Sequence, residues 1–212
     1  MSTIALLGSG RVAAVLAPKL AAAGHDLIVG SRSAAEASAR WAGPTVRFAA
    51  HAEAIRAAAI VINATPGESS LERLSALRGE LRGKILVDVS NAARRGGDGL
   101  PGGLCYPNGS LAEHLQTALP DTAVVKTLNT MLYSVMTDPQ GLKTPPTAFL
   151  SGDDAAAKAT VQGLLGDLGW PLEWTLDLGG VATARGPEAM VLSVPDFIRS
   201  QGFMPFALTV AR

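Results

Sequence analysis

The sequence is poor in several features that mark common classes of protein. Its 212 residues include one cysteine, Cys105, so an internal disulfide is excluded and a reducing, cytoplasmic location is expected. The 18 basic and 18 acidic side chains balance to zero net charge, and no long Lys/Arg run is present. Nucleic acid and anionic membrane are therefore not expected as partners, and a small molecule is the better expectation.

Long hydrophobic runs and familiar catalytic motifs are also missing. No apolar stretch approaches the roughly 20 residues that span a bilayer, so no membrane insertion is expected. The apolar start lacks a basic leading region and is interrupted at 8–11 by Gly-Ser-Gly-Arg, which favours a first core strand over a signal peptide. No CxxC, HxxxH or GxSxG pattern occurs, so neither a zinc site nor an α/β-hydrolase is expected. Surface or capping roles are expected for the scattered His25, His51 and His114.

Short apolar runs alternate with alanine-rich or amphipathic segments along the chain. The runs suit strands that are buried on both faces of a parallel sheet, and the intervening segments suit helices. This alternation predicts an α/β fold with a doubly wound, mostly parallel sheet. The expected strands are 3–8, 26–30, 58–64, 84–90, 122–129 and 146–152, and the expected helices are 11–23, 33–42, 51–58, 69–79 and 110–118.

The second half of the chain has a different character. Residues 91–109 are so rich in Gly and Pro that a long loop near the carboxyl ends of the strands is expected. A helix should follow at about 153–168. The tail, 170–212, predicts a short strand, a Gly-Gly turn and one or two helices.

A glycine pattern follows the first expected strand. Gly8, Gly10 and Ala13 match G-x-G-x-x-G/A: the first glycine permits a tight turn, the second lets the backbone approach a pyrophosphate, and the third small residue lets helix pack on strand. The phosphate would lie on the N–H groups of the helix that begins near Arg11. In this context the pattern predicts a dinucleotide site, with a simple tight turn as the alternative.

The end of the second strand distinguishes the nicotinamide cofactors. An NAD site usually offers Asp or Glu there, whereas an NADP site offers groups that bind phosphate. Here the strand ends in Ser31 and Arg32, a hydroxyl and a guanidinium that suit a 2'-phosphate. NADP is therefore preferred, with Arg32 as a solvated loop charge the alternative. Glu36 lies close to the expected phosphate pocket.

Polar side chains also follow the later strands. Ligands of open α/β sheets lie outside the carboxyl ends of the strands, so these turns are expected to flank the nicotinamide ribose and ring. Ordinary turn formation explains several of the same residues equally well. The residues concerned are Asn63, Thr65, Pro66, Asn91, Lys126, Asn129 and Thr130.

Six segments together resemble a known family. GSGRVAAVLAPKLAAAGHDLIVGSR, NATPG, VDVSNA, VVKTLNTM, FLSGDDAAAK and GGVATARGPEAM occur in the order seen in the coenzyme F420-dependent NADP oxidoreductases, and the similarity covers nearly the whole chain. The resemblance implies a Rossmann domain at 1–150 and a small C-terminal helical portion at 151–212 that completes an acceptor cleft. It also implies hydride transfer between NADPH and a deazaflavin, coenzyme F420, or a similar flavin-type acceptor.

The resemblance further assigns residues to the pyrophosphate, the 2'-phosphate, the nicotinamide and the place where the two rings meet. In that order, the implied cofactor-binding residues are Gly8, Ser9, Gly10, Arg11 and Val12; Ser31 and Arg32; Ala64, Thr65 and Pro66; and Asn91, Asn129 and Thr130.

Hydride transfer between two redox rings needs no acid from the protein, so no catalytic residue and no metal are expected. Two other functions stay open. One is an NADPH-dependent dehydrogenase or reductase of a small carbonyl or imine, for which Lys126 is the candidate catalytic residue in the cleft. The other is a non-enzymatic NADP(H)-binding sensor. The apolar C-terminal helix and exposed aromatics favour a homodimer.

Overall fold

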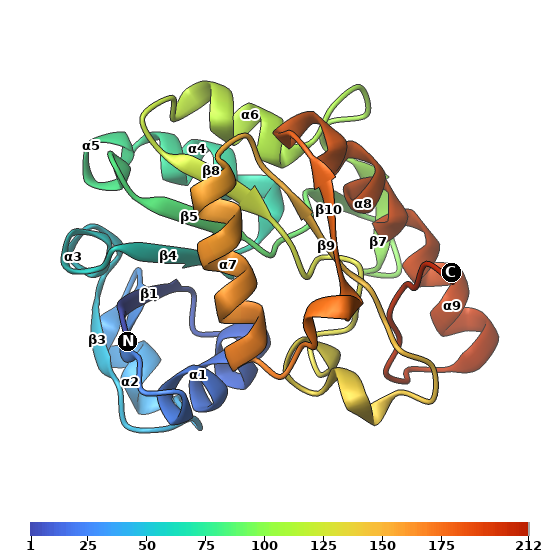
Figure 1. Ribbon diagram of the computed structural model, residues 1–212, viewed down its shortest axis with the longest axis horizontal. Coiled ribbons are helices and arrows are strands. Elements are labelled where there is room, and N and C mark those ends of the chain that lie inside the picture. The colour runs from blue at the N-terminus through green and yellow to red at the C-terminus, as the bar shows by residue number, and fades with distance from the viewer. Residues whose placement is uncertain (212) are drawn as a thin grey trace.

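An eight-stranded sheet organises the computed structural model, which describes residues 1–211 (Figure 1). The strands are β1 (Thr3–Leu7), β2 (Asp26–Ser31), β3 (Arg47–Ala50), β4 (Ile60–Asn63), β5 (Ile85–Asp88), β8 (Ala123–Lys126), β9 (Ala148–Ser151) and β10 (Thr175–Gly179). Across the sheet their order is β10-β9-β8-β5-β4-β1-β2-β3.

The pairing of these strands gives the Rossmann arrangement. The strands β3-β2-β1-β4-β5-β8 are mutually parallel, and the chain changes its direction of progress across the sheet between β1 and β4. Ligands of doubly wound sheets bind at this switch point. β9 pairs antiparallel with β8, and β10 pairs parallel with β9. The expected doubly wound, mostly parallel sheet is therefore confirmed.

Helices cover both faces of the sheet. α1 (Arg11–Ala22) and α7 (Ala155–Asp167) pack on one face, and α3 (His51–Ala57), α4 (Ser70–Ser75) and α6 (Leu111–Ala118) on the other (Figure 1). Successive strand residues point to opposite faces. In β1, Ile4 and Leu6 accordingly join one hydrophobic cluster while Ala5 and Leu7 join the other.

Three elements differ from the expectation. β3 was not predicted, because it is a four-residue edge strand without a fully buried side chain. The helix expected at 69–79 is interrupted, giving α4 and the short α5 (Arg78–Leu81). The expected loop at 91–109 contains a hairpin, β6 (Ala93–Arg95) and β7 (Pro101–Leu104). Gly and Pro are depleted in strands, so the composition of this segment did not indicate a hairpin. The turn of the hairpin includes Gly99 at φ +76°.

The C-terminal segment returns to the carboxyl end of the sheet. It contains α8 (Arg185–Ala189) and α9 (Val194–Gln201), in agreement with the helices expected in the tail. After α9, Leu132 N donates to Phe206 O at 2.9 Å and Leu208 N donates to Thr130 O at 3.1 Å. The tail is thereby held beside the segment that follows β8.

The division of the chain at residue 150 stays a prediction. That position falls within β9, and the same sheet continues to β10. Across residues 1–211, the helices are too short or too polar for any of them to traverse a bilayer.

Candidate functional site

A cavity of about 790 Å³ opens at the carboxyl ends of the parallel strands. It extends from the loop after β1, past the ends of β2, β4 and β5, to the segment after β8 and the C-terminal segment. The structure brings all the residues assigned to the cofactor into this one lining, while their binding role stays a prediction. They are Gly8, Ser9, Gly10, Arg11, Val12, Ser31, Arg32, Ala64, Thr65, Pro66, Asn91, Asn129 and Thr130.

The two glycines of the loop meet different surroundings. Gly8 has φ +106°, and a Cβ atom there would lie 2.8 Å from the carbonyl oxygen of Ala64 at the end of β4. A Cβ atom at Gly10 would meet no heavy atom within 4 Å. The packing of the chain itself therefore requires a glycine at position 8. Gly10 is not required by packing and leaves open space beside the cavity. Because the first turn of α1 also carries no acidic residue, its N–H groups suit an anion such as a pyrophosphate.

Basic groups gather at the β2 end of the cavity. Ser31, Arg32, His51 and Arg73 all line it. Arg73 is held by its own contacts, donating from Nη1 to Thr65 Oγ1 at 2.7 Å and from Nη2 to a serine hydroxyl at 2.6 Å. Burial and then the charge of Arg32 lower the pKa of the Arg73 guanidinium. Burial, then Arg73 and Arg32, lower the pKa of His51. Such mutual repulsion among like charges is relieved by a bound anion.

Glu36 does not enter this basic cluster. Its carboxylate accepts a hydrogen bond at 2.9 Å from Arg40 Nη2, one helical turn later, and both side chains are largely exposed. The pairing directs the acidic charge to the solvent side of α2 (Ala34–Ala39), and neither residue lines the cavity.

Two members of the basic cluster were missed by sequence reasoning. His51, expected at the surface or in a capping role, is the first residue of α3 and is partly buried in the cavity lining. The sequence did not indicate this position, because His51 directly follows the carboxyl end of β3 and that strand was not predicted. Arg73 lies inside α4, eight residues after Thr65, and only the helical turn brings its side chain back to that hydroxyl.

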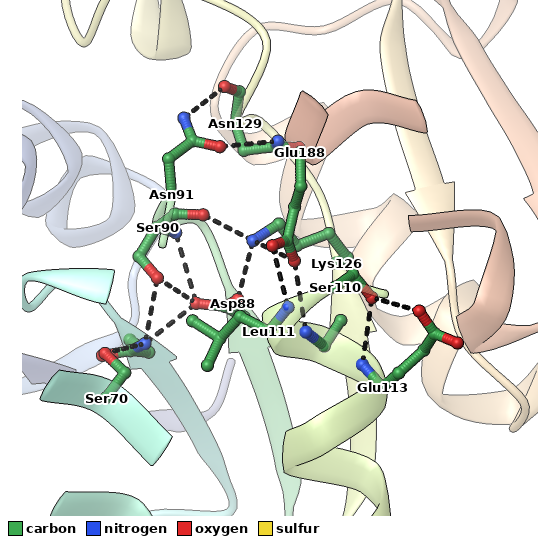
Figure 2. Close-up of polar contacts among 12 residues, drawn as sticks. Ser70, Asp88, Ser90, Asn91, Ser110, Leu111, Glu113, Lys126, Asn129 and Glu188 are labelled. Carbon is green, nitrogen blue, oxygen red and sulfur yellow. Dashed lines mark hydrogen bonds and ion pairs between the residues drawn. The ribbon is translucent and has the colours of Figure 1, made fainter. Parts of the chain in front are cut away.

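The middle of the cavity is lined by paired amides. Asn91 Nδ2 donates to Asn129 O at 2.8 Å, and Asn129 Nδ2 donates to Asn91 Oδ1 at 3.0 Å (Figure 2). The residue before Asn129, Leu128, has φ +57°, the one positive value for a non-glycine residue within 1–211. This conformation costs roughly 1–2 kcal/mol, so surrounding contacts must hold the turn. Strain of this kind concentrates at functional sites.

The expectation that Lys126 is available in the cleft is wrong. Its side chain is 1% exposed and is absent from the cavity lining. Its Nζ lies 2.8 Å from Asp88 Oδ2 and 3.0 Å from Glu188 Oε1 (Figure 2). The lysine lies among buried acceptors, because Asp88 is its directly paired neighbour on β5 and Glu188 reaches it from α8.

The far end of the cavity is mostly apolar. Its lining comes from the segment after β8 and from the C-terminal helices and tail. Among these residues, Tyr133 lies under Arg11, whose guanidinium carbon is 5.2 Å from the ring centroid. The apolar-end residues are Met131, Leu132, Tyr133, Met136, Met190, Val191, Val194, Phe197, Phe206 and Leu208.

Metal-ligating residues do not gather in the part of the chain that the structure describes. Residues 1–211 contain no group of three or more His, Cys, Asp or Glu side chains arranged to hold a metal ion.

Known proteins share this fold. A crystal structure from Arthrobacter sp. FB24, described as a candidate F420-dependent NADP-reductase, has a TM-score of 0.89 and 38% identity, with 100% of both chains covered. Protein SMa0349 from Sinorhizobium meliloti has a TM-score of 0.69 and 28% identity, covering 87% of this chain and 88% of that one.

A curated relative extends the comparison to a longer protein. Metalloreductase STEAP3 from Rattus norvegicus is 29% identical over 190 residues, which are 89% of this chain and 36% of the relative. The chain thus spans about a third of the length of this relative.

The family itself follows from two of the matches. Residues 3–92, from the start of β1 to the turn after β5, match the family model described as NADP oxidoreductase, coenzyme F420-dependent. The likeness to the Arthrobacter protein extends over the full length, including the C-terminal helices. The chain belongs to the family of coenzyme F420-dependent NADP oxidoreductases.

Proposed function

We propose that the chain transfers a hydride between NADPH and a flavin-type ring, with the deazaflavin coenzyme F420 as its principal acceptor. The observation that carries this proposal is the continuity of the cavity. One space of about 790 Å³ joins the glycine loop and basic cluster to an apolar end. Such a space suits a charged dinucleotide at one end and a second ring at the other. NADPH supplies the hydride when bound, while the chain orients both rings and excludes water.

The donor half would be held by three groups of residues. The N–H groups at the start of α1 would bind the pyrophosphate beside Gly10. Arg32 and Arg73, with Ser31 and His51, would bind the 2'-phosphate by charge-assisted hydrogen bonds. The turn after β4 at 64–66, together with Asn91, would line the nicotinamide.

The acceptor half would be formed by the Asn91–Asn129 pair and the apolar end. The amides offer hydrogen bonds to the polar edge of a ring, and the apolar side chains cover its faces. Phe197 and Phe206 form an edge-to-face pair there, with ring centroids 5.6 Å apart. A fused heteroaromatic ring is the acceptor shape that this combination favours.

The first test separates the cofactor role of the glycine loop from its structural role. Gly10→Val is expected to abolish NADPH binding while the melting temperature changes little, because its φ of −87° suits any residue and its Cβ faces open space. Gly8→Val is expected to lower the melting temperature as well, since it adds a clash at a positive φ. NADPH titration by fluorescence and thermal melting measure both effects. Unchanged NADPH affinity in Gly10→Val would contradict the pyrophosphate assignment.

The second test concerns the 2'-phosphate. Arg32→Ala and Arg73→Ala should each weaken NADPH by about 10- to 100-fold, because a charge-assisted hydrogen bond is worth roughly 1.5–3 kcal/mol. NADH, which lacks the phosphate, should change by less than about threefold. Arg40→Ala is the matched control, since Arg40 is exposed and pairs with Glu36 outside the cavity. An equal loss for both cofactors would rule the assignment out.

The third test uses pH. Burial, Arg73 and Arg32 keep the pKa of His51 below its usual value, so the imidazole is neutral at pH 7 in the free protein. A phosphate dianion beside it would raise that pKa, and binding would take up a proton. NADPH affinity should therefore strengthen from pH 8 to 6.5 by at most about tenfold per unit. NADH affinity and the His51→Gln variant should show no such trend, and a parallel trend for NADH would refute this role.

The fourth test identifies the acceptor. Oxidation of NADPH, followed by its absorbance, is expected with F420 and more weakly or not at all with FMN, riboflavin and ferric chelates. Tight NADPH binding without turnover of any acceptor, carbonyls and imines included, would favour a sensor instead.

Tyr133 supports one second candidate, the reduction of a small carbonyl or imine, because it lines the cavity and its phenol can act as a proton donor. In the acceptor assay, Tyr133→Phe should leave turnover of a ring acceptor within about threefold, whereas loss of a general acid typically costs 100-fold or more. A large loss in Tyr133→Phe together with turnover of imines would transfer the assignment to this second function.

A further inference from the structure

A buried ion cluster lies directly behind the cavity wall. It consists of Lys126 on β8, Asp88 at the end of β5 and Glu188 on α8, whose side chains are 1%, 0% and 6% exposed (Figure 2). Lys126 Nζ lies 2.8 Å from Asp88 Oδ2 and 3.0 Å from Glu188 Oε1, and it also donates to the carbonyl oxygen of Ser90. The cluster therefore joins two strand ends to a helix more than 60 residues away in the chain.

The charges of the cluster are balanced by the start of a helix. One ammonium faces two carboxylates, which leaves one excess negative charge. Glu188 Oε2 accepts a hydrogen bond from Leu111 N at 2.8 Å, and Oε1 accepts one from Ala112 N at 3.1 Å. These N–H groups begin α6, where the helix dipole favours an anion. Burial alone would lower the pKa of Lys126, but Asp88 and Glu188 raise it above its usual value, so the ammonium stays charged.

One side of the cluster continues into the polar middle of the cavity. Asp88 Oδ1 accepts hydrogen bonds from Asn63 Nδ2 and from Ser90 Oγ, both at 2.8 Å. Lys126 fixes the Ser90 carbonyl, and the next residue, Asn91, makes the paired-amide contact with Asn129. The ammonium therefore holds the turn that presents Asn91 to the cavity.

The other side of the cluster leads to the apolar end. The residues that follow Glu188 within the next ten positions form what we call the acceptor wall: Met190, Val191, Val194 and Phe197, all of which line the cavity. Glu188 is the last buried acidic group before this wall along the chain. Its carboxylate thus links the wall to the same ammonium that holds Asn91.

A buried ion cluster is weak evidence for stability, because well-packed apolar residues often stabilise a core equally well or better. In some proteins, what such a cluster adds is a defined relative position for its members. A second ion pair joins the same helices at the surface, where Arg185 Nη2 on α8 lies 2.6 Å from Glu113 Oε1 on α6. Docking of α8 on α6 therefore has support besides Glu188, and the two pairs can be compared directly.

We propose that Glu188 is a positioning residue for hydride transfer: through Lys126 it fixes the acceptor wall against the Asn91–Asn129 pair and so sets where the acceptor ring lies relative to the nicotinamide. The proposal rests on the proposed function for its acceptor step. Hydrogen exchange and NADPH affinity test, without any acceptor, whether Glu188 holds the acceptor wall while the glycine loop and the basic cluster still bind NADPH.

The experiment compares Glu188→Gln with the matched control Glu113→Gln in the full chain. Glu188→Gln removes the charge between Lys126 and the α6 amides, so hydrogen exchange at 189–201 should accelerate by about tenfold or more. NADPH affinity should stay within about twofold. With F420 as acceptor, kcat/KM should fall by about tenfold or more, mainly through KM, which corresponds to roughly 1.4 kcal/mol. Glu113→Gln should leave all three quantities near those of the unmodified chain.

The conservative variant Glu188→Asp retains the charge with a shorter reach and should restore much of the exchange protection and of the KM. If Glu188→Gln does not fold, Glu188→Asp carries the same comparison with smaller effects in the same direction. Unchanged exchange at 189–201 would overturn the proposal, as would a loss of NADPH affinity equal to the loss of kcat/KM. If the unmodified chain reduces no ring acceptor, the proposed function fails, while exchange and NADPH binding still decide the role of Glu188.

Discussion

The close approach of the β1 loop to the end of β4 is the constraint on which the site depends. The chain changes its direction of progress across the sheet between these two strands, and this opens a crevice at their carboxyl ends. Gly8 makes the approach possible, since any Cβ there would meet the carbonyl of Ala64. With that contact made, α1 starts beside the cavity, and the polar turns after β4, β5 and β8 follow in sheet order. The glycine loop thus determines where the cavity begins, and the order of the strands determines the order in which the polar turns line it.

Although the net charge is zero, the molecule contains two charged clusters with different roles. At the β2 end, burial and then the charges of Arg73 and Arg32 lower the pKa of His51, and an incoming anion would offset these positive charges. Behind the cavity, the carboxylates of Asp88 and Glu188 are balanced within the fold itself by Lys126 and by the N–H groups at the start of α6. The first cluster is therefore suited to binding and the second to fixing positions. Composition alone cannot distinguish these uses, because both contribute to the same balanced total.

Local patterns predicted the fold and identified residues at the strand ends that line the cavity, for a physical reason. A glycine loop, a strand end and a short polar turn are each encoded within a few residues, so Gly10, Ser31 and Arg32 could be assigned without coordinates. Groups that depend on folding could not. Arg73 reaches Thr65 through a helical turn, and His51 follows an edge strand too short to recognise. Lys126 was misjudged because its partners come from a neighbouring strand and from α8, and no local pattern marks a lysine as buried.

At the acceptor end, the sequence and the chemistry of the cofactors do not determine how the two rings lie relative to each other. That relative position depends on the folded structure. Hydride transfer depends steeply on the approach of two rings, and a displacement of about 1 Å can cost 100-fold in rate. The donor ring would rest on turns anchored to the sheet, whereas the acceptor wall comes from short helices near the chain end, with Phe197 partly exposed. Elements of this kind open locally at low free energy unless tethered. The strained turn at Leu128 and the cluster around Lys126 are fixed elements next to the Asn91–Asn129 pair, where the proposed reaction would need the two rings held in a defined relative position.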